Sequence, residues 1–275
     1  MPDRPIPYVG VSGVMLPEQT AFLRRAFAEL PPFPLHRQLG VFVLASEKTL
    51  NGEPNRYPEK YPTLARLGAP FLGGADELSM IHVSADTDVG LASLLSRAMG
   101  AAGPKCDGAQ VNVSWPDPAD LSRFREEHPD ARVVLQIGPR AFASLRETAC
   151  SFSPESRHRL ITAMARDEVL VLNVGRYVTK GAITDVLLDG RAGTGKPFDP
   201  VVVDPIVALL AWTFPTLGIG VAGGLCAASI PSLAKLLRAF PWLNLDAEAK
   251  LQLPDGYGLD LAACSDYLRA VRAAL

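Results

Sequence analysis

An aspartate followed by a glycine-rich loop is the part of this sequence best suited to chemistry. Asp189 ends an apolar run, residues 183–188, that is typical of a buried strand, and the loop after it contains Gly193, Gly195 and Lys196. A carboxylate at the carboxyl end of a strand can act as an acid or a base. Glycine amides beside a lysine can hold a phosphate. The segment therefore indicates a site for a phosphorylated ligand.

The same loop partly fits the phosphate-binding loop of nucleotide-binding proteins. Residues 190–196 have the GxxxxGK spacing, which requires Ser or Thr next, because that hydroxyl coordinates magnesium. Here the next residue is Pro197, which has no hydroxyl, and the chain continues into Phe198 and Asp199 without a clear helix start. A nucleotide site is therefore the weaker alternative.

Strand and helix patterns alternate along the chain, as in a parallel α/β fold. Strands are expected at 8–12, 39–45, 80–84, 109–114, 132–138, 183–189, 217–222 and 242–246. Helices are expected at 17–30, 88–99, 118–128, 154–165, 202–212, 230–239 and 261–274. With no linker or charged block between these units, the sequence predicts one closed (β/α)8 barrel over residues 1–275.

Two segments depart from this regular alternation. Residues 46–62, after the second strand, are polar and rich in turn-forming residues, which predicts a long loop. Residues 139–182 are too long for one ordinary connection, which predicts an insertion between strands five and six. Within it, the apolar run 169–174 fits a strand or a helix equally well.

Composition narrows the classes of function. The chain has 275 residues, is 48% hydrophobic and carries a net charge of -2, which favours one soluble domain and disfavours nucleic-acid or membrane-surface partners. The four cysteines are far apart, without CxxC pairs or metal-ligand spacing with histidines. This pattern predicts reduced thiols, a cytoplasmic location and no bound metal or cofactor. No segment has the pattern of a signal peptide or a membrane helix. The oligomeric state is left open.

Short motifs at the expected strand ends form a recognisable series. They are GVSG at 10–13, GVFV at 40–43 with NRY at 55–57, AQVNV at 109–113, LLDGRAGTGKPFDP at 187–200, VAGGL at 221–225 and LNLDAEA at 243–249. In this order they resemble KICG, GFVF…RY, VQLHG, LLD…GGTGKTFDW, LAGGL and VDVSSGVE of the phosphoribosylanthranilate isomerase family. These enzymes are the (β/α)8 barrels of tryptophan biosynthesis, and the resemblance extends over nearly the whole chain.

The resemblance implies an Amadori rearrangement of a phosphorylated sugar, which needs one acid and one base. Asp189 matches the family's acid. The family's base is a strand-one cysteine, and Ser12 occupies that position here. A serine without a partner base has too high a pKa to take a proton from carbon. Arg56 matches the arginine that holds the anthranilate carboxylate.

Further positions imply contacts with the substrate. Asn112 replaces a histidine, and Asp246 matches the strand-eight aspartate expected near the substrate amine. Gly223 and Gly224 match half of the phosphate cup, where backbone amides hold the phosphate. The other half departs from the family, because Glu248 stands there and would repel a phosphate unless a cation such as the nearby Lys250 compensates it.

Three functions remain open at this stage. The chain is an isomerase of this family or a relative, a catalytically silent barrel that binds a metabolite or a partner, or an enzyme with reassigned residues. For the last, Glu47 and Lys48 after strand two are candidates, as is Glu248. His82, alone on strand three, is expected to be a core histidine with its hydrogen bonds satisfied.

Overall fold

Eight parallel strands close into a barrel in a computed structural model of the chain, which describes residues 4–145, 166–189, 200–254, 256 and 258–275. The strands are β1 Tyr8–Ser12, β2 Gln38–Ser46, β3 Glu77–Ser84, β4 Gly108–Asn112, β5 Arg132–Ile137, β6 Asp185–Leu188, β7 Gly218–Ala222 and β8 Asn244–Ala247. Each strand pairs in parallel with the next, and β8 pairs with β1. The predicted (β/α)8 barrel is confirmed.

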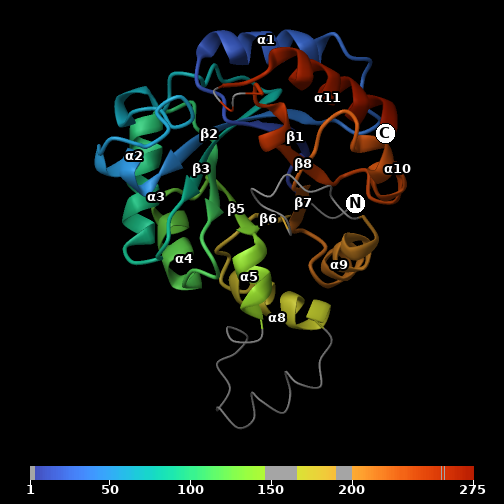
Figure 1. Cartoon of the computed structure of the whole chain (residues 1–275). Helices are drawn as coiled ribbons and strands as arrows, with labels where there is room; N and C mark the ends of the chain where they lie inside the picture. Colours follow the sequence, from blue (N-terminus) through green and yellow to red (C-terminus); the bar gives the residue numbers. More distant parts are fainter. Residues whose placement is uncertain (1–3, 146–165, 190–199, 255, 257) are drawn as a thin grey trace.

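Helices surround the barrel (Figure 1). They are α1 Pro17–Ala28, α2 Glu47–Asn51, α3 Leu91–Ala102, α4 Pro118–Glu127, α5 Pro139–Ala143, α8 Arg166–Val178, α9 Pro200–Thr213, α10 Ile230–Ala239 and α11 Leu261–Ala274, with 3-10 turns η1 Leu64–Arg66 and η2 Ala249–Leu251. The outward side chains of the strands, such as Val9 and Val11, pack beneath these helices in one continuous apolar core. Among the described residues, no helix is long and apolar enough to span a membrane.

The middle of the barrel interior is an apolar layer. Its members come from six strands and are Tyr8, Phe42, Leu78, Met80, Val134, Leu187 and Ala222. Gly10 and Gly40 make room for it, because a Cβ at either position would come within 2.8 Å or 2.6 Å of the Phe42 ring. We call this set the apolar layer.

Below the apolar layer, a buried ion pair closes the amino-terminal end of the barrel. Arg132 donates to both carboxylate oxygens of Asp185, at 2.9 and 2.6 Å. Asn244 also donates to Asp185, at 2.9 Å. At Gly218, on the neighbouring strand, a Cβ would lie 1.8 Å from Asp185 Oδ1, so only glycine fits there. We call Arg132, Asp185 and Asn244 the polar floor.

The structure settles one open prediction and corrects another. The run Val169–Val174 is helical, because it belongs to the longer amphipathic helix α8. The polar segment after β2 begins with a helix, α2, rather than with the predicted loop. Its first turn is capped by Ser46, whose side chain accepts a hydrogen bond from Thr49 N. The helix expected at 154–165 lies outside the described residues, and the insertion stays a prediction.

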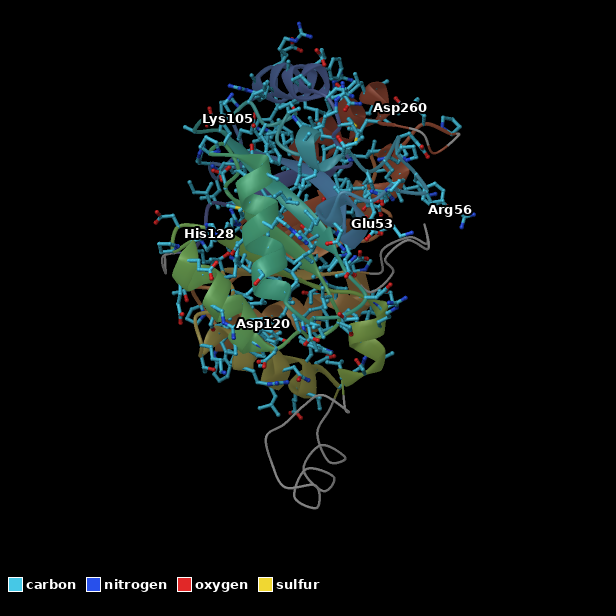
Figure 2. The ribbon with its side chains drawn as sticks, turned by 90° about the vertical axis from the view of Figure 1, so that its left-hand side faces the viewer. Glu53, Arg56, Lys105, Asp120, His128 and Asp260 are labelled. Atoms are coloured by element: carbon cyan, nitrogen blue, oxygen red, sulfur yellow. The ribbon has the colours of Figure 1, made fainter. Side chains whose placement is uncertain are left out.

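The two ends of the barrel are lined by different loops. Figure 2 shows Glu53, Arg56 and Asp260 on one side of the molecule and Lys105 and His128 on the other. The first three follow strands, whereas the last two precede strands. The side that carries Arg56 is therefore the carboxyl-terminal face, where loops carry the active sites of (β/α)8 enzymes.

Candidate active site

A polar layer lies above the apolar layer, at the carboxyl ends of the strands. Its buried members are Ser12, His82, Gln110, Gln136, Asp189 and Asp246. Ser12, Asp189 and Asp246, from motifs at the expected strand ends, lie at one end of the barrel, since hydrogen bonds connect all three through this layer.

Two side chains hold Asp246, on β8, by hydrogen bonds. Ser12 Oγ donates to its Oδ1 at 2.8 Å, and Gln110 Nε2 donates to its Oδ2 at 3.0 Å. Burial raises the pKa of Asp246 above its ordinary value, and these two hydrogen bonds offset only part of that effect. The raised pKa gives the Asp246 carboxylate a higher affinity for a proton, and the two hydrogen bonds fix its orientation. Both properties suit a general base.

Asp189 follows directly after β6 and is held from the neighbouring strand. Gln136 Nε2 donates to Asp189 Oδ2 at 2.8 Å, while Gln136 Oε1 accepts from Gln110 Nε2 at 3.2 Å. Since Gln110 also contacts Asp246, two glutamine amides connect the two carboxylates across the barrel.

The two carboxylates flank one small side chain. Leu188 pairs with Val221 and Ala222 pairs with Asp246, so Asp189, next in the chain after Leu188, stands beside Ala222. With strands about 4.8 Å apart, the Cα atoms of the two aspartates are separated by roughly 10 Å. In the strand register, Ala222 lies between the two aspartates.

His82 differs from its predicted role as a satisfied core residue. The side chain is buried, with 5% of its surface exposed, and its Nδ1 lies 3.3 Å from Gln110 Nε2. Its Nε2 has no hydrogen-bond partner among the described residues. Burial lowers the pKa of His82 although the carboxylates of Glu248 and Asp246 oppose this shift. The ring is therefore neutral near pH 7.

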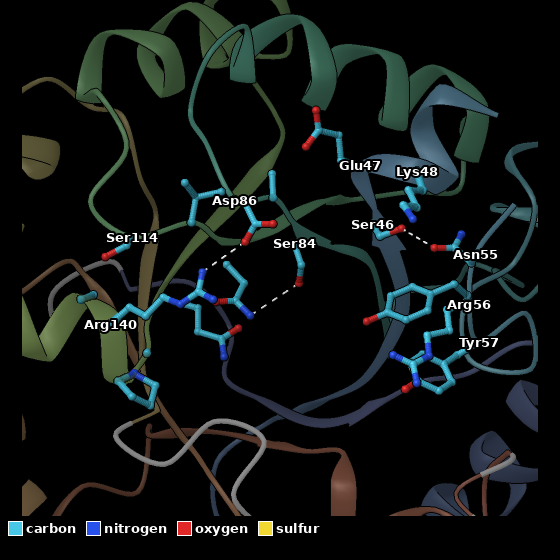
Figure 3. Close-up of a pocket in the computed structure, with 18 residues that line it drawn as sticks. Ser46, Glu47, Lys48, Asn55, Arg56, Tyr57, Ser84, Asp86, Ser114 and Arg140 are labelled. Atoms are coloured by element: carbon cyan, nitrogen blue, oxygen red, sulfur yellow. Dashed lines mark hydrogen bonds and ion pairs between the residues drawn. The ribbon is translucent and has the colours of Figure 1, made fainter. Parts of the chain in front are cut away.

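A cavity of about 720 Å³ opens beside the polar layer at the ends of β2 to β5. Figure 3 shows Lys48, Arg56 and Tyr57 on one side of it and Arg140 and Asp86 on the other. The predicted residues Arg56 and Asn112 both line this cavity, as does Gln136 at its inner end.

The residues of this cavity differ in how firmly they are held. Arg56 is exposed, with its guanidinium 5.3 Å from the centre of the Tyr57 ring. Asn112 Nδ2 donates to Ser84 Oγ at 3.5 Å. Arg140 pairs with Asp86 at 3.1 Å across exposed side chains, so either is free to exchange its partner for a ligand. The reassignment candidates Glu47 and Lys48 also line the cavity.

Of the glycines predicted to hold a phosphate, the structure describes Gly223 and Gly224. Gly223 and Gly224 follow β7 with φ angles of 108° and 67°, which glycine adopts without strain. Glu248, opposite them on the family pattern, pairs with Lys60 at 2.5 Å and not with Lys250. Gly193 and Gly195, with the rest of the glycine-rich loop and its nucleotide alternative, lie outside the described residues.

Sequence reasoning missed Gln110, Gln136 and Lys60. The two glutamines had a signal, because they are polar residues at the inward, even-numbered positions of otherwise apolar strands. No sequence pattern pointed to Lys60, because only the course of the segment after α2 brings it to Glu248.

Comparisons with known proteins identify the fold. No protein-family model matches the sequence, and no curated protein is similar to it. N-(5'-phosphoribosyl)anthranilate isomerase from Pyrococcus furiosus superposes with a TM-score of 0.58 at 14% identity, covering 97% of this chain and 99% of that one. TrpF from Jonesia denitrificans gives 0.56 at 16% identity, with 98% of each chain covered.

Similarity of this kind is not confined to isomerases. The catalytic domain of a hyperthermophilic chitinase from Pyrococcus furiosus gives a TM-score of 0.56 at 12% identity, covering 98% of this chain and 97% of that one. At such identities the comparisons establish the fold and leave the reaction open. In fold, the chain is a (β/α)8 barrel similar to phosphoribosylanthranilate isomerases.

Proposed function

We propose that this chain is an isomerase-type enzyme that binds a phosphorylated sugar at the carboxyl-terminal face and moves protons between neighbouring carbons. The observation that supports it best is the pair of aspartates, Asp189 and Asp246, fixed on either side of Ala222 and connected by glutamine amides. Two carboxylates in different environments can divide the roles of acid and base.

In this proposal, the base is Asp246 rather than the residue at the family's cysteine position. Ser12 Oγ donates a hydrogen bond to Asp246 and so positions the carboxylate. Asp189, as the acid, gives a proton to the ring oxygen when the sugar opens. Asp246 takes the proton from C2. The C2 hydroxyl then loses its proton as it becomes a carbonyl and C1 gains one, so the two protons gained by the ring oxygen and C1 equal the two lost from C2 and its hydroxyl.

The ligand is placed by groups on opposite sides of the barrel mouth. The Gly223 and Gly224 amides would hold the phosphate, and the ion pair with Lys60 removes the repulsion that an unpaired Glu248 would cause. Arg56, in the cavity on the β2 side, would hold a carboxylate at the other end of the ligand.

Turnover of phosphoribosylanthranilate tests this function. The wild-type chain should be active, and Asp189→Asn and Asp246→Asn should each lose at least about a hundredfold in kcat, the usual contribution of a positioned acid or base. The matched control is Asp266→Asn, an exposed aspartate on α11. Phosphate binding without turnover in the wild type would favour the silent barrel, and full activity of both active-site variants would exclude the proposed roles.

A further inference from the structure

The two carboxylates determine, through the two glutamines, which ring nitrogen of His82 carries the proton. Asp189 accepts from Gln136 Nε2, which turns Gln136 Oε1 towards Gln110. Gln110 then presents its NH₂ group to Gln136 and Asp246, and the same group faces His82 Nδ1 at 3.3 Å. An N–H facing Nδ1 requires that this nitrogen be unprotonated, so the proton of the neutral ring is on Nε2.

Within the described part of the protein, the Nε2–H group of His82 is left unsatisfied in this chain of hydrogen bonds, as is Gln110 Oε1. The N–H group is buried inside the barrel mouth and has no acceptor among the described residues. A buried donor without a partner costs free energy, and such a group in a native structure calls for an explanation. The charged groups around the ring are Asp246, Glu248 and Lys60. The last two neutralise each other, and Asp246 is occupied by Ser12 and Gln110.

We propose that His82 is a ligand-contacting residue whose Nε2–H donates a hydrogen bond to an oxygen of an open-chain phosphosugar. The oxygen that fits is the one on C2, which is a carbonyl or an enol oxygen in the open-chain sugar. A neutral imidazole suits this role, because it polarises the oxygen without giving up its proton. This assignment rests on the proposed function and adds to it the residue that recognises the oxygen.

Binding of ribulose 5-phosphate, measured by calorimetry, tests the assignment, since this probe carries a C2 carbonyl. His82→Leu should weaken binding about tenfold, in line with the loss of one hydrogen bond. His82→Gln, which keeps an N–H donor, should recover most of that loss. The matched control is His36→Gln, an exposed histidine that pairs with Asp76 on the surface, and it should bind as the wild type does.

Nitrogen-15 NMR of the wild-type histidines gives a readout that needs no variant to fold. The His82 ring should carry its proton on Nε2 at pH 7, and that N–H signal should shift when ribulose 5-phosphate is added. A ring protonated on Nδ1, or unchanged affinity in His82→Leu with binding intact in the wild type, would overturn the assignment alone. No binding of the probe to the wild type would overturn the proposed function and the assignment together.

Discussion

Asp189 and Asp246 belong to strands separated by β7, yet the side chains of Gln136 and Gln110 connect them by hydrogen bonds across the barrel. Gln110 has one NH₂ group and three acceptors within 3.3 Å, namely Asp246, Gln136 and His82. Two protons cannot serve three acceptors fully, so a change at one acceptor alters the hydrogen bonding of the other two. The two carboxylates are thus coupled through the amides of Gln136 and Gln110.

Ser12 variants distinguish a positioning hydroxyl from a lost base. Ser12→Ala removes a hydrogen bond to the ionised Asp246, so the pKa of Asp246 should rise further above its ordinary value. As the pH is lowered, the carboxylate should then be protonated earlier, and activity that needs it should fall earlier too. The acidic limb of kcat/KM should move to higher pH by about one pH unit. The pH profiles of wild type and variant provide the measurement.

Ser12→Cys gives the opposite test at the same position. If Asp246 is the base, a thiol at position 12 should not raise turnover much. A rise in turnover of about a hundredfold, the usual contribution of a positioned base, would assign that role to the first strand instead.

Asp246→Asn should cost activity but stabilise the fold. Because burial raises the pKa of Asp246, the folded protein binds this proton more tightly than the unfolded chain does. Folded stability therefore falls as pH rises from the ordinary pKa, about 3.9, through the raised one. At pH 7.5 the variant avoids this penalty, and its melting temperature should exceed that of wild type by a few degrees.

The pH dependence of this difference provides its own control. Near pH 4 the wild-type carboxyl holds its proton when folded, so the two melting curves should approach each other. A variant that is less stable than wild type at pH 7.5 would mean that hydrogen bonds to Ser12 and Gln110 outweigh the cost of burial.

The ion pair of Lys60 with Glu248 should matter for anion binding. Burial opposes the charge of Lys60, but the nearby carboxylate outweighs it and raises the pKa of the amine. Lys60→Met leaves Glu248, directly after β8, uncompensated and should weaken binding of inorganic phosphate about tenfold. Adding Glu248→Gln to this variant should restore much of the affinity, as calorimetry can measure. Equal affinity in all three proteins would place phosphate elsewhere.

Asp185→Asn should destabilise the protein without changing its site. Arg132 would keep its charge in the buried polar floor with its main partner lost, which typically costs 3–5 kcal/mol. For a chain of this size the melting temperature should fall by on the order of 10 °C. Ribulose 5-phosphate affinity at low temperature should match the wild type. A changed affinity would show that the two ends of the barrel are linked.

The sequence predicted the features that depend on strand ends. Parallel strands in a closed barrel bring their carboxyl ends together, so Ser12, Asp189 and Asp246 could be placed at one face from motif order alone. The ambiguity of Val169–Val174 arose because a short apolar run has no decisive period, and only its continuation to Val178 makes it helical.

The contacts between strands were beyond sequence reasoning. His82 was expected to be a core residue with its hydrogen bonds satisfied, because a lone histidine on a strand usually finds hydrogen-bond partners. Its real environment depends on Gln110 and on the orientation that Gln136 imposes. Likewise, Lys60 meets Glu248 only because the segment after α2 passes over the barrel mouth to β8.

The apolar layer separates two polar regions of the barrel interior. Tyr8 and Phe42 pack with ring centres 5.3 Å apart, between the charged Arg132–Asp185 pair and the proton-handling groups above. Gly10 and Gly40 permit this packing, because a Cβ at either position would come too close to the Phe42 ring. Residues at the mouth can therefore change while Arg132, below the layer, keeps its partner Asp185 and its surroundings.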